Sequence, residues 1–392
     1  MDFQTISAIV FIAALTILLI IKRKKLDIQK IIFPLLYIIL YRSKFGLKFM
    51  KSFPEKYPRL VKFFASAGVI IGFIGMVFIS AQLIYLFQQM LVQPDTPSGV
   101  APVLPIPVKG AVYVPFFFWI LSIFVIATVH EFAHGVVSNL YKVPVKTSGF
   151  AIFGLVLPII PAAFVEPDER KLQRKPGWEQ LSVFAAGPFA NIVLGFIVLG
   201  LMLAVMNPLS AIAFVNDGVT VDQVFNGSAA EEAGISEDEI IMYVDGDEVL
   251  TVDEFTESLS DKSPGETISI STQSGEYDAV LNPRDDDSER GFLGVSVTQY
   301  VSENPGFVEK YGLLALNLIK WFSELFFWLF LLNIGIGLFN LLPLGIVDGG
   351  RMLQIALLGV FKNKKKGAEK VWKMVSLFFL FIVLFMVISS FF

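Results

Sequence analysis

The sequence predicts a polytopic α-helical membrane protein with about six transmembrane helices, a re-entrant hairpin and a small α/β domain outside the membrane. Hydrophobic residues make up 55% of the 392 residues and charged residues only 17%, whereas soluble domains carry about 25% charged residues. Six stretches are long and apolar enough, or nearly so, to cross a bilayer, which takes about 20 residues. One interval, 207–312, is instead acidic, with 23 Asp and Glu against four Lys and Arg.

The six expected spans are separated by loops of different charge. They lie at 5–21, 63–91, 114–141, 178–206, 313–342 and 371–392. The first stretch does not have the pattern of a cleaved signal peptide, because Asp2 precedes its apolar core and the basic run 22–25 follows it. We therefore expect this stretch to remain as a membrane helix.

The Lys and Arg residues predict the orientation in a cell membrane. Residues 22–62 carry 12 of them, and the segments 142–177 and 362–373 are also basic. Basic loops stay in the cytoplasm, so these three are expected inside. The loop 92–113 and the acidic insert 207–312 are then expected outside, in strict alternation. The predicted protein is a multi-pass membrane protein with an extracytoplasmic insert.

Two shorter apolar stretches break this pattern. Residues 31–41 are too short to span, and we expect them along the membrane surface. Residues 149–165 contain two glycines and two prolines and have basic residues at both ends. Irregular backbone at membrane depth must be buried in protein or line a cavity, which favours a re-entrant hairpin for 149–165. A plain seventh span is the alternative.

The acidic insert has the pattern of a small mixed α/β domain. Strands are expected at 219–225, 240–244 and 267–272. Ser228 is placed to cap a short helix through Ala233. Thr251 and Glu254 form a capping-box pattern for a second helix through Leu259.

The sequence His130-Glu131-Phe132-Ala133-His134 predicts a metal site. Residues i and i+4 of a helix share a face, so both imidazoles can reach one ion, and no Cys is present to offer a thiolate. Zinc accepts two imidazoles and a carboxylate and leaves a fourth position for water. The metal lowers the pKa of that water, and Glu131 can take its proton. The alternative is two hydrogen-bonded core histidines. This alternative is less favoured because ionisable residues inside an apolar membrane helix are costly and usually functional.

The third metal ligand must come from another part of the chain. Apart from the histidine motif, the acidic residues in or beside the expected spans are chiefly Glu324 and Asp348. Asp348 follows its helix at the cytoplasmic end, at the depth of His134, whereas Glu324 lies at a different depth. Pro343 is expected to interrupt the helix, and the two glycines after Asp348 to let the backbone bend. An ordinary helix cap at Asp348 is the alternative.

Three motifs together resemble the site-2 proteases, a family of zinc metalloproteases that cut within membranes. They are the 130–134 motif, Gly187-Pro188-x-x-Asn191, and Asn340-x-x-Pro343-x-x-x-x-Asp348-Gly349. The resemblance implies one Zn²⁺ ion with His130, His134 and Asp348 as ligands and Glu131 as the catalytic general base.

The resemblance also implies that Asn340 and Asn191 bind the substrate. Asn340 would hold the unwound substrate backbone, since an amide side chain both donates and accepts hydrogen bonds. The alternative for Asn340 is a structural role, in which its amide forms hydrogen bonds with helix carbonyls that are freed near Pro343. The alternative for Asn191 is packing at the Gly-Pro kink.

The insert resembles a PDZ domain at 227–235 and 241–246, although Asp238-Glu239 stands where that family usually has Gly-Asp. A PDZ-like domain would contact a peptide or a substrate ectodomain by strand addition.

The predicted function is a zinc-dependent intramembrane endopeptidase that cleaves transmembrane helices. A catalytically inactive membrane adaptor acting through the PDZ-like domain is the alternative; a transporter would favour paired broken helices, which the sequence lacks. The expected partners are the lipid bilayer and single-span membrane proteins, and no nucleic acid, since the chain has no basic surplus. The expected domains are N-terminal helices (1–113), two core segments (114–206 and 313–361), the PDZ-like insert (207–312) and a C-terminal helix (362–392).

Overall fold

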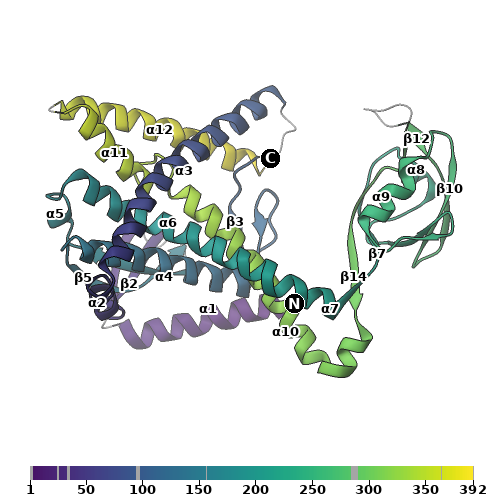
Figure 1. Cartoon of the computed structure of the whole chain (residues 1–392), viewed down its shortest axis with the longest axis horizontal. Coiled ribbons are helices and arrows are strands. Elements are labelled where there is room, and N and C mark those ends of the chain that lie inside the picture. Colours follow the sequence, from purple (N-terminus) through teal and green to yellow (C-terminus); the bar gives the residue numbers. More distant parts are fainter. Residues whose placement is uncertain are drawn as a thin grey trace. The chain divides into compact units, whose positions relative to one another are not determined.

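A computed structural model describes residues 3–23, 26–32, 36–93, 98–155, 157–283, 290–362 and 364–391 (Figure 1). The chain divides into two compact units. The first combines Met1–Met202 with Glu324–Phe392, and the second is Leu203–Ser323. All the residues expected at the metal site belong to the first unit, and the acidic insert expected at 207–312 lies within the second.

Five helices among the described residues are long and apolar enough to cross a membrane. They are α3 (Pro58–Val92), α4 (Phe116–Leu140), the continuous stretch Gly177–Ala213 that begins with α6 (Gly177–Leu201), α10 (Pro305–Phe339) and α12 (Lys365–Ser389). These helices cover five of the six expected spans. The other, expected at 5–21, forms α1 (Phe3–Lys22), of which Ala8–Lys22 counts as a shorter apolar helix.

The remaining elements of the first unit are short. They are α2 (Leu47–Lys56), α5 (Glu169–Leu172), α11 (Asp348–Val360) and the paired strands β3 (Val103–Leu104) and β4 (Val112–Tyr113). α6 packs against α3, α4 and α11. It is most deeply buried between Ser182 and Asn191, where small side chains such as Ala185 and Ala186 are fully buried. This stretch of α6 forms one wall of the site described below.

A four-stranded antiparallel sheet completes the first unit. Its order is β1 (Leu26–Ile32), β2 (Leu36–Ser43), β5 (Val145–Leu155) and β6 (Leu157–Pro167). β5 and β6 form the hairpin expected at 149–165, rather than a seventh spanning helix, and pair along their length. Residue 156 lies outside the described residues.

The segment expected along the membrane surface at 31–41 contributes to the sheet, a pairing that the sequence did not predict. Leu36–Ser43 pairs with Ser148–Leu155 of the hairpin. Residues 33–35 lie outside the described residues. A short apolar run fits either a helix or a buried strand, and pairing with β5 satisfies backbone groups that an isolated segment would leave unbonded.

The second unit contains a short π-helix (Met202–Met206), α7 (Asn207–Ala213), the start of α10, and the insert. The strands of the insert are β7 (Phe214–Val224), β8 (Ile240–Val244), β9 (Asp247–Glu248), β10 (Thr267–Thr272), β11 (Glu276–Val280), β12 (Asn282–Pro283), β13 (Gly291–Phe292) and β14 (Val295–Glu303). The main sheet has the order β11-β10-β8-β7-β14, and β9 pairs with β8. Its buried core includes Val221, Ile241, Phe255, Ile268 and Ile270.

The helices of the insert confirm both predicted caps. α8 (Ala229–Ala233) follows Ser228, whose hydroxyl accepts a hydrogen bond from the Glu231 amide. α9 (Val252–Ser260) begins with the complete capping box of Thr251 and Glu254. Strands β8 and β10 match their predicted ranges, while β7 begins five residues earlier than expected. Local sequence signals therefore placed both helices and three of the strands of this domain, but not β9 or the strands from β11 to β14.

We expect opposite sides of the membrane for the insert and for the start of α12. The chain contains no Cys, so a single introduced Cys can be labelled without background. Gly275→Cys lies in an exposed turn of the insert with no atom near the added Cβ, and Lys366→Cys is exposed near the start of α12. A membrane-impermeant maleimide should label Gly275→Cys in intact cells and Lys366→Cys only after lysis. Labelling of both in intact cells would contradict the alternation of the basic loops.

Candidate metal centre

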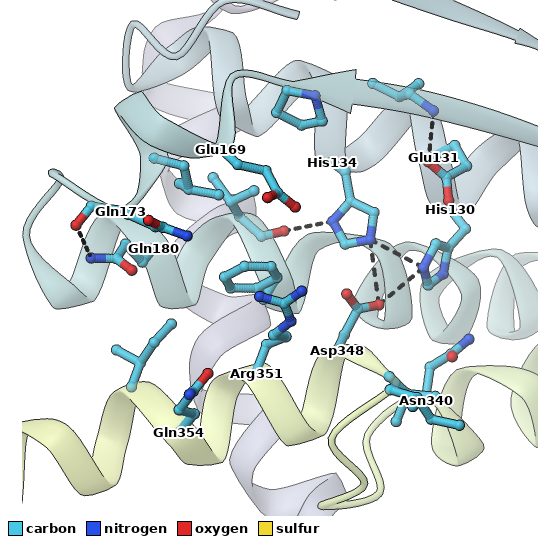
Figure 2. A pocket seen from close by; sticks show the side chains of 18 of the residues that line it. His130, Glu131, His134, Glu169, Gln173, Gln180, Asn340, Asp348, Arg351 and Gln354 are labelled. Atoms are coloured by element: carbon cyan, nitrogen blue, oxygen red, sulfur yellow. Dashed lines mark hydrogen bonds and ion pairs between the residues drawn. The ribbon is translucent and has the colours of Figure 1, made fainter. Parts of the chain in front are cut away.

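Two histidines on α4 and one aspartate on α11 converge on one point (Figure 2). His130 and His134 are one turn apart on the same face of α4, and their Nε2 atoms are 3.1 Å from each other. The Oδ2 atom of Asp348 is 3.1 Å from the Nε2 of His130 and 3.4 Å from that of His134. Two segments separated by more than 200 residues therefore present three ligand atoms to one position.

The turn between α10 and α11 brings Asp348 to the histidines. α10 ends at Phe339, four residues before Pro343, and α11 begins at Asp348. The carbonyl of Asn340 accepts a hydrogen bond of 2.7 Å from the Gly349 amide, which closes the turn. The predicted interruption of the helix is thus confirmed, and it places the carboxylate at the first residue of a new helix.

Gly349 and Gly350 act differently from the prediction. They were expected to bend the backbone, but both lie in the first turn of α11. A Cβ at Gly349 would lie 2.2 Å from the Leu341 carbonyl oxygen, and one at Gly350 would lie 1.8 Å from that of Leu344. The two glycines are required because α11 packs directly on the backbone of the preceding turn.

The three ligand atoms fit a zinc ion. With Zn–N and Zn–O bonds of about 2.0–2.1 Å, a tetrahedral arrangement separates its ligand atoms by about 3.3 Å, close to the observed separations of 3.1, 3.1 and 3.4 Å. Two imidazole nitrogens and one carboxylate oxygen are also a typical donor set for a catalytic zinc, which leaves a fourth position open.

Gly187 on α6 provides the space next to these ligand atoms. A Cβ at this position would lie 2.4 Å from the Nε2 of His134 and 2.6 Å from the Nε2 of His130. Any other residue would therefore press on both nitrogens. The sequence contained this glycine in its Gly-Pro motif, but nothing in the local pattern showed that it faces the histidines.

Each histidine has a second hydrogen-bond partner on α6. The Nδ1 of His134 lies 2.7 Å from the backbone carbonyl of Val183. The Nδ1 of His130 lies 3.1 Å from the side-chain amide of Asn191, and Asn191 is completely buried. Residues 183, 187 and 191 are spaced by four, so they form one stripe along α6 that faces the histidine pair.

Glu131 lies between the histidines and the hairpin. Its Oε2 atom accepts a hydrogen bond of 2.9 Å from the backbone amide of Val165 on β6. The carboxylate is part-buried and lines the same cavity as His130, His134 and Asp348. This bond to the edge strand could not be predicted from the sequence, because the donor is a backbone amide, which every residue except proline has.

A cavity of about 690 Å³ opens onto these groups. Asn340 lines it, as expected for a residue that contacts a substrate, and so do the polar residues Glu169, Gln173, Gln180, Arg351 and Gln354. The guanidinium of Arg351 lies 6.0 Å from the ring centre of Phe184. The prediction did not include this polar wall, which is assembled from α5, α6 and α11.

We predict that Gly187→Ala removes bound zinc without unfolding the protein. The added methyl group would occupy the space between the two Nε2 atoms. Gly200→Ala on the same helix is the matched control, because nothing lies within 4 Å of its added Cβ. Zinc content per chain, measured by atomic emission after purification, should fall sharply for Gly187→Ala only. Wild-type zinc content in Gly187→Ala would show that the ion is not bound between these histidines.

The comparison with protein families agrees with this arrangement. The model of peptidase family M50 matches residues 118–383, about two thirds of the chain, from α4 into α12. The chain belongs to this family. All the residues of the candidate metal centre fall inside the matched region.

Individual relatives of this M50 chain are distant. It is 27% identical over 297 residues to a zinc metalloprotease RasP of Shouchella clausii, covering 64% of this chain and 66% of the relative. It is 25% identical over 259 residues to a RasP of Oceanobacillus iheyensis, covering 53% and 57%. An uncharacterized protein of Methanocaldococcus jannaschii is 24% identical over 266 residues, covering 68% and 64%. The match thus spans somewhat less than two thirds of the length of each relative.

Proposed function

We propose that this chain is a zinc-dependent endopeptidase that cleaves transmembrane helices of other membrane proteins. The observation that carries the proposal is the convergence of His130, His134 and Asp348 beside Glu131 in one cavity. The same chain has five helices suited to a membrane and belongs to a peptidase family. Two of the relatives bear the name zinc metalloprotease.

Each residue has a role that follows from its chemistry. His130, His134 and Asp348 would hold one Zn²⁺ ion, which supplies Lewis acidity and lowers the pKa of water at its open position. Glu131 would accept a proton from the attacking water and pass it to the leaving amine. A carboxylate at this place suits the task because it lines the cavity and is held by the Val165 amide. The amide of Asn340 would bind the substrate backbone in the same cavity.

The edge of β6 offers a place for an unwound substrate. β6 ends the order of the sheet, so its outer edge pairs with no other strand in the described part of the chain. The amide of Val165 points from that edge to Glu131. A helix must unwind before its peptide carbonyls can be attacked, and a segment added to this edge as a further strand would lie beside the general base.

The insert belongs to the proposal as a PDZ-like module outside the membrane. Its fold of two short helices and an antiparallel sheet is of the size and class that such a domain requires. A peptide or the ectodomain of a substrate would contact it. An inactive adaptor that works through this module would not need Glu131, which is present in the cavity.

A reconstituted assay with metal removal tests the proposal. The purified chain in liposomes should cleave a co-reconstituted single-span protein that carries helix-breaking residues in its membrane segment. Treatment with a zinc chelator should stop the cleavage, and added Zn²⁺ should restore it. Cleavage that continues after complete zinc removal would refute a zinc peptidase. Zinc binding without cleavage of any unwound helix would favour a non-catalytic role.

A further inference from the structure

The histidines receive unequal support from α6. His134 bonds to a backbone carbonyl, that of Val183, at 2.7 Å. His130 instead faces a side chain, the amide of Asn191, at 3.1 Å. A backbone carbonyl is present whatever residue occupies the position, whereas the support of His130 depends on one side chain.

The metal centre determines which nitrogen of His130 carries the proton. The Nε2 of His130 lies among the ligand atoms, 3.1 Å from both the Asp348 Oδ2 and the His134 Nε2. A nitrogen that binds a metal offers its lone pair and carries no proton, so the proton of a neutral imidazole must be on Nδ1. That Nδ1–H group is a donor and requires an acceptor.

Asn191 can supply that acceptor. Its Oδ1 is buried and has no hydrogen-bond partner among the described residues, while the Nδ2 position faces the Nδ1 of His130. A half-turn about the Cβ–Cγ bond exchanges the two atoms of the amide. Only the orientation with Oδ1 toward His130 joins a donor to an acceptor when Nε2 is a ligand, and it also satisfies the buried oxygen.

We propose that Asn191 is a positioning residue that fixes the tautomer and the ring orientation of His130. Its side-chain carbonyl accepts the hydrogen bond of the His130 Nδ1–H group, which leaves Nε2 free to bind zinc, as the Val183 carbonyl does for His134. The inference rests on the proposed zinc centre and assigns Asn191 a role in holding the metal instead of the substrate. Loss of such a partner typically weakens metal affinity by about 10- to 100-fold.

The stripe of Val183, Gly187 and Asn191 on α6 then positions both metal-binding imidazoles. Val183 and Asn191 orient the two imidazoles from opposite ends, and Gly187 between them leaves the space in which the nitrogens converge. Because the three positions are on one helix, their spacing is fixed by the helical repeat. The Asn191 side chain is the element of this stripe that a conservative substitution can alter without a clash.

The test compares zinc affinity in three variants by chelator competition. Asn191→Leu keeps the size of the side chain and removes the acceptor, so it should weaken zinc binding by about 10- to 100-fold. Asn191→Asp keeps an acceptor oxygen and should restore most of the affinity. Asn333→Leu is the matched control, since Asn333 is another completely buried asparagine, on α10, whose Nδ2 bonds to the Leu329 carbonyl. Its substitution should leave zinc affinity unchanged.

A second measurement reads the tautomer directly in the wild-type protein. The chain contains only two histidines, so ¹⁵N-histidine labelling gives spectra of these two imidazoles alone. In the zinc-loaded protein both rings should carry the proton on Nδ1, and in Asn191→Leu the His130 signal should change while that of His134 stays.

Three results would overturn the inference while the proposed function stands. One is a wild-type His130 with its proton on Nε2. Another is an Asn191→Leu variant with unchanged zinc affinity. The third is an Asn191→Leu variant whose only change is a raised KM, as expected for a substrate contact. A wild-type protein that binds no zinc would refute the proposed function itself.

Discussion

Glu131→Gln should abolish peptide cleavage and leave zinc bound. Gln matches the size of Glu and can still accept the hydrogen bond from the Val165 amide, so the hairpin should stay in place. It cannot take up a proton, which removes the general base. A positioned base contributes about 10²- to 10⁴-fold to a rate, and we expect a loss of at least about 10³-fold.

The measurement is the single-turnover cleavage of a reconstituted single-span substrate, together with the zinc content of each preparation. Glu179→Gln is a suitable control, because Glu179 is a part-buried residue on α6 that pairs with Lys175 at 3.6 Å. It should keep wild-type activity. Cleavage by Glu131→Gln within tenfold of wild type would require another base, and loss of zinc from this variant would assign Glu131 to metal binding.

Asp348→Ala should lose zinc, and with it all cleavage, whereas Asn340→Ala should keep zinc and lose part of its activity. The first substitution removes the oxygen that lies 3.1 and 3.4 Å from the two imidazole nitrogens, leaving two ligands for an ion that takes three from a protein. The second removes only a group that lines the cavity. We expect zinc affinity to fall by more than about 100-fold in Asp348→Ala, beyond the effect of losing an indirect partner.

Glu324→Ala is the control for this experiment. Glu324 was the other acidic candidate for a third ligand, and the metal-ligand group found among the described residues includes Asp348 instead. Its replacement should leave zinc binding intact. Equal zinc content in wild type and Asp348→Ala would exclude Asp348 from the site, and zinc loss from Asn340→Ala would show that Asn340 supports the metal.

The sequence alone determined the elements whose signals are local. The spacing of His130 and His134 predicted a shared helix face, and α4 provides it. The apolar lengths predicted the five helices that are suited to a membrane, together with a sixth at 5–21 that is shorter. Ser228, Thr251 and Glu254 marked where α8 and α9 begin. Pro343 predicted the break before Asp348. The histidine spacing, the caps and the proline break each depend on interactions within about one helical turn, and an apolar span is one continuous run of residues, so neighbouring residues carry the information.

Only the tertiary structure decided which distant segments meet. β2 was not recognised as a strand because an apolar run does not specify its partners, which are the neighbouring β1 and β5, more than 100 residues away along the chain. The same holds for the Asn191–His130 contact, the Val165–Glu131 bond and the approach of Gly187 to both imidazoles. Periodicity predicts which face of a helix is buried, but packing between helices and strands determines what that face touches. The metal ligands could be named from the sequence, whereas the groups that orient them became visible only when α6 and β6 were packed against α4.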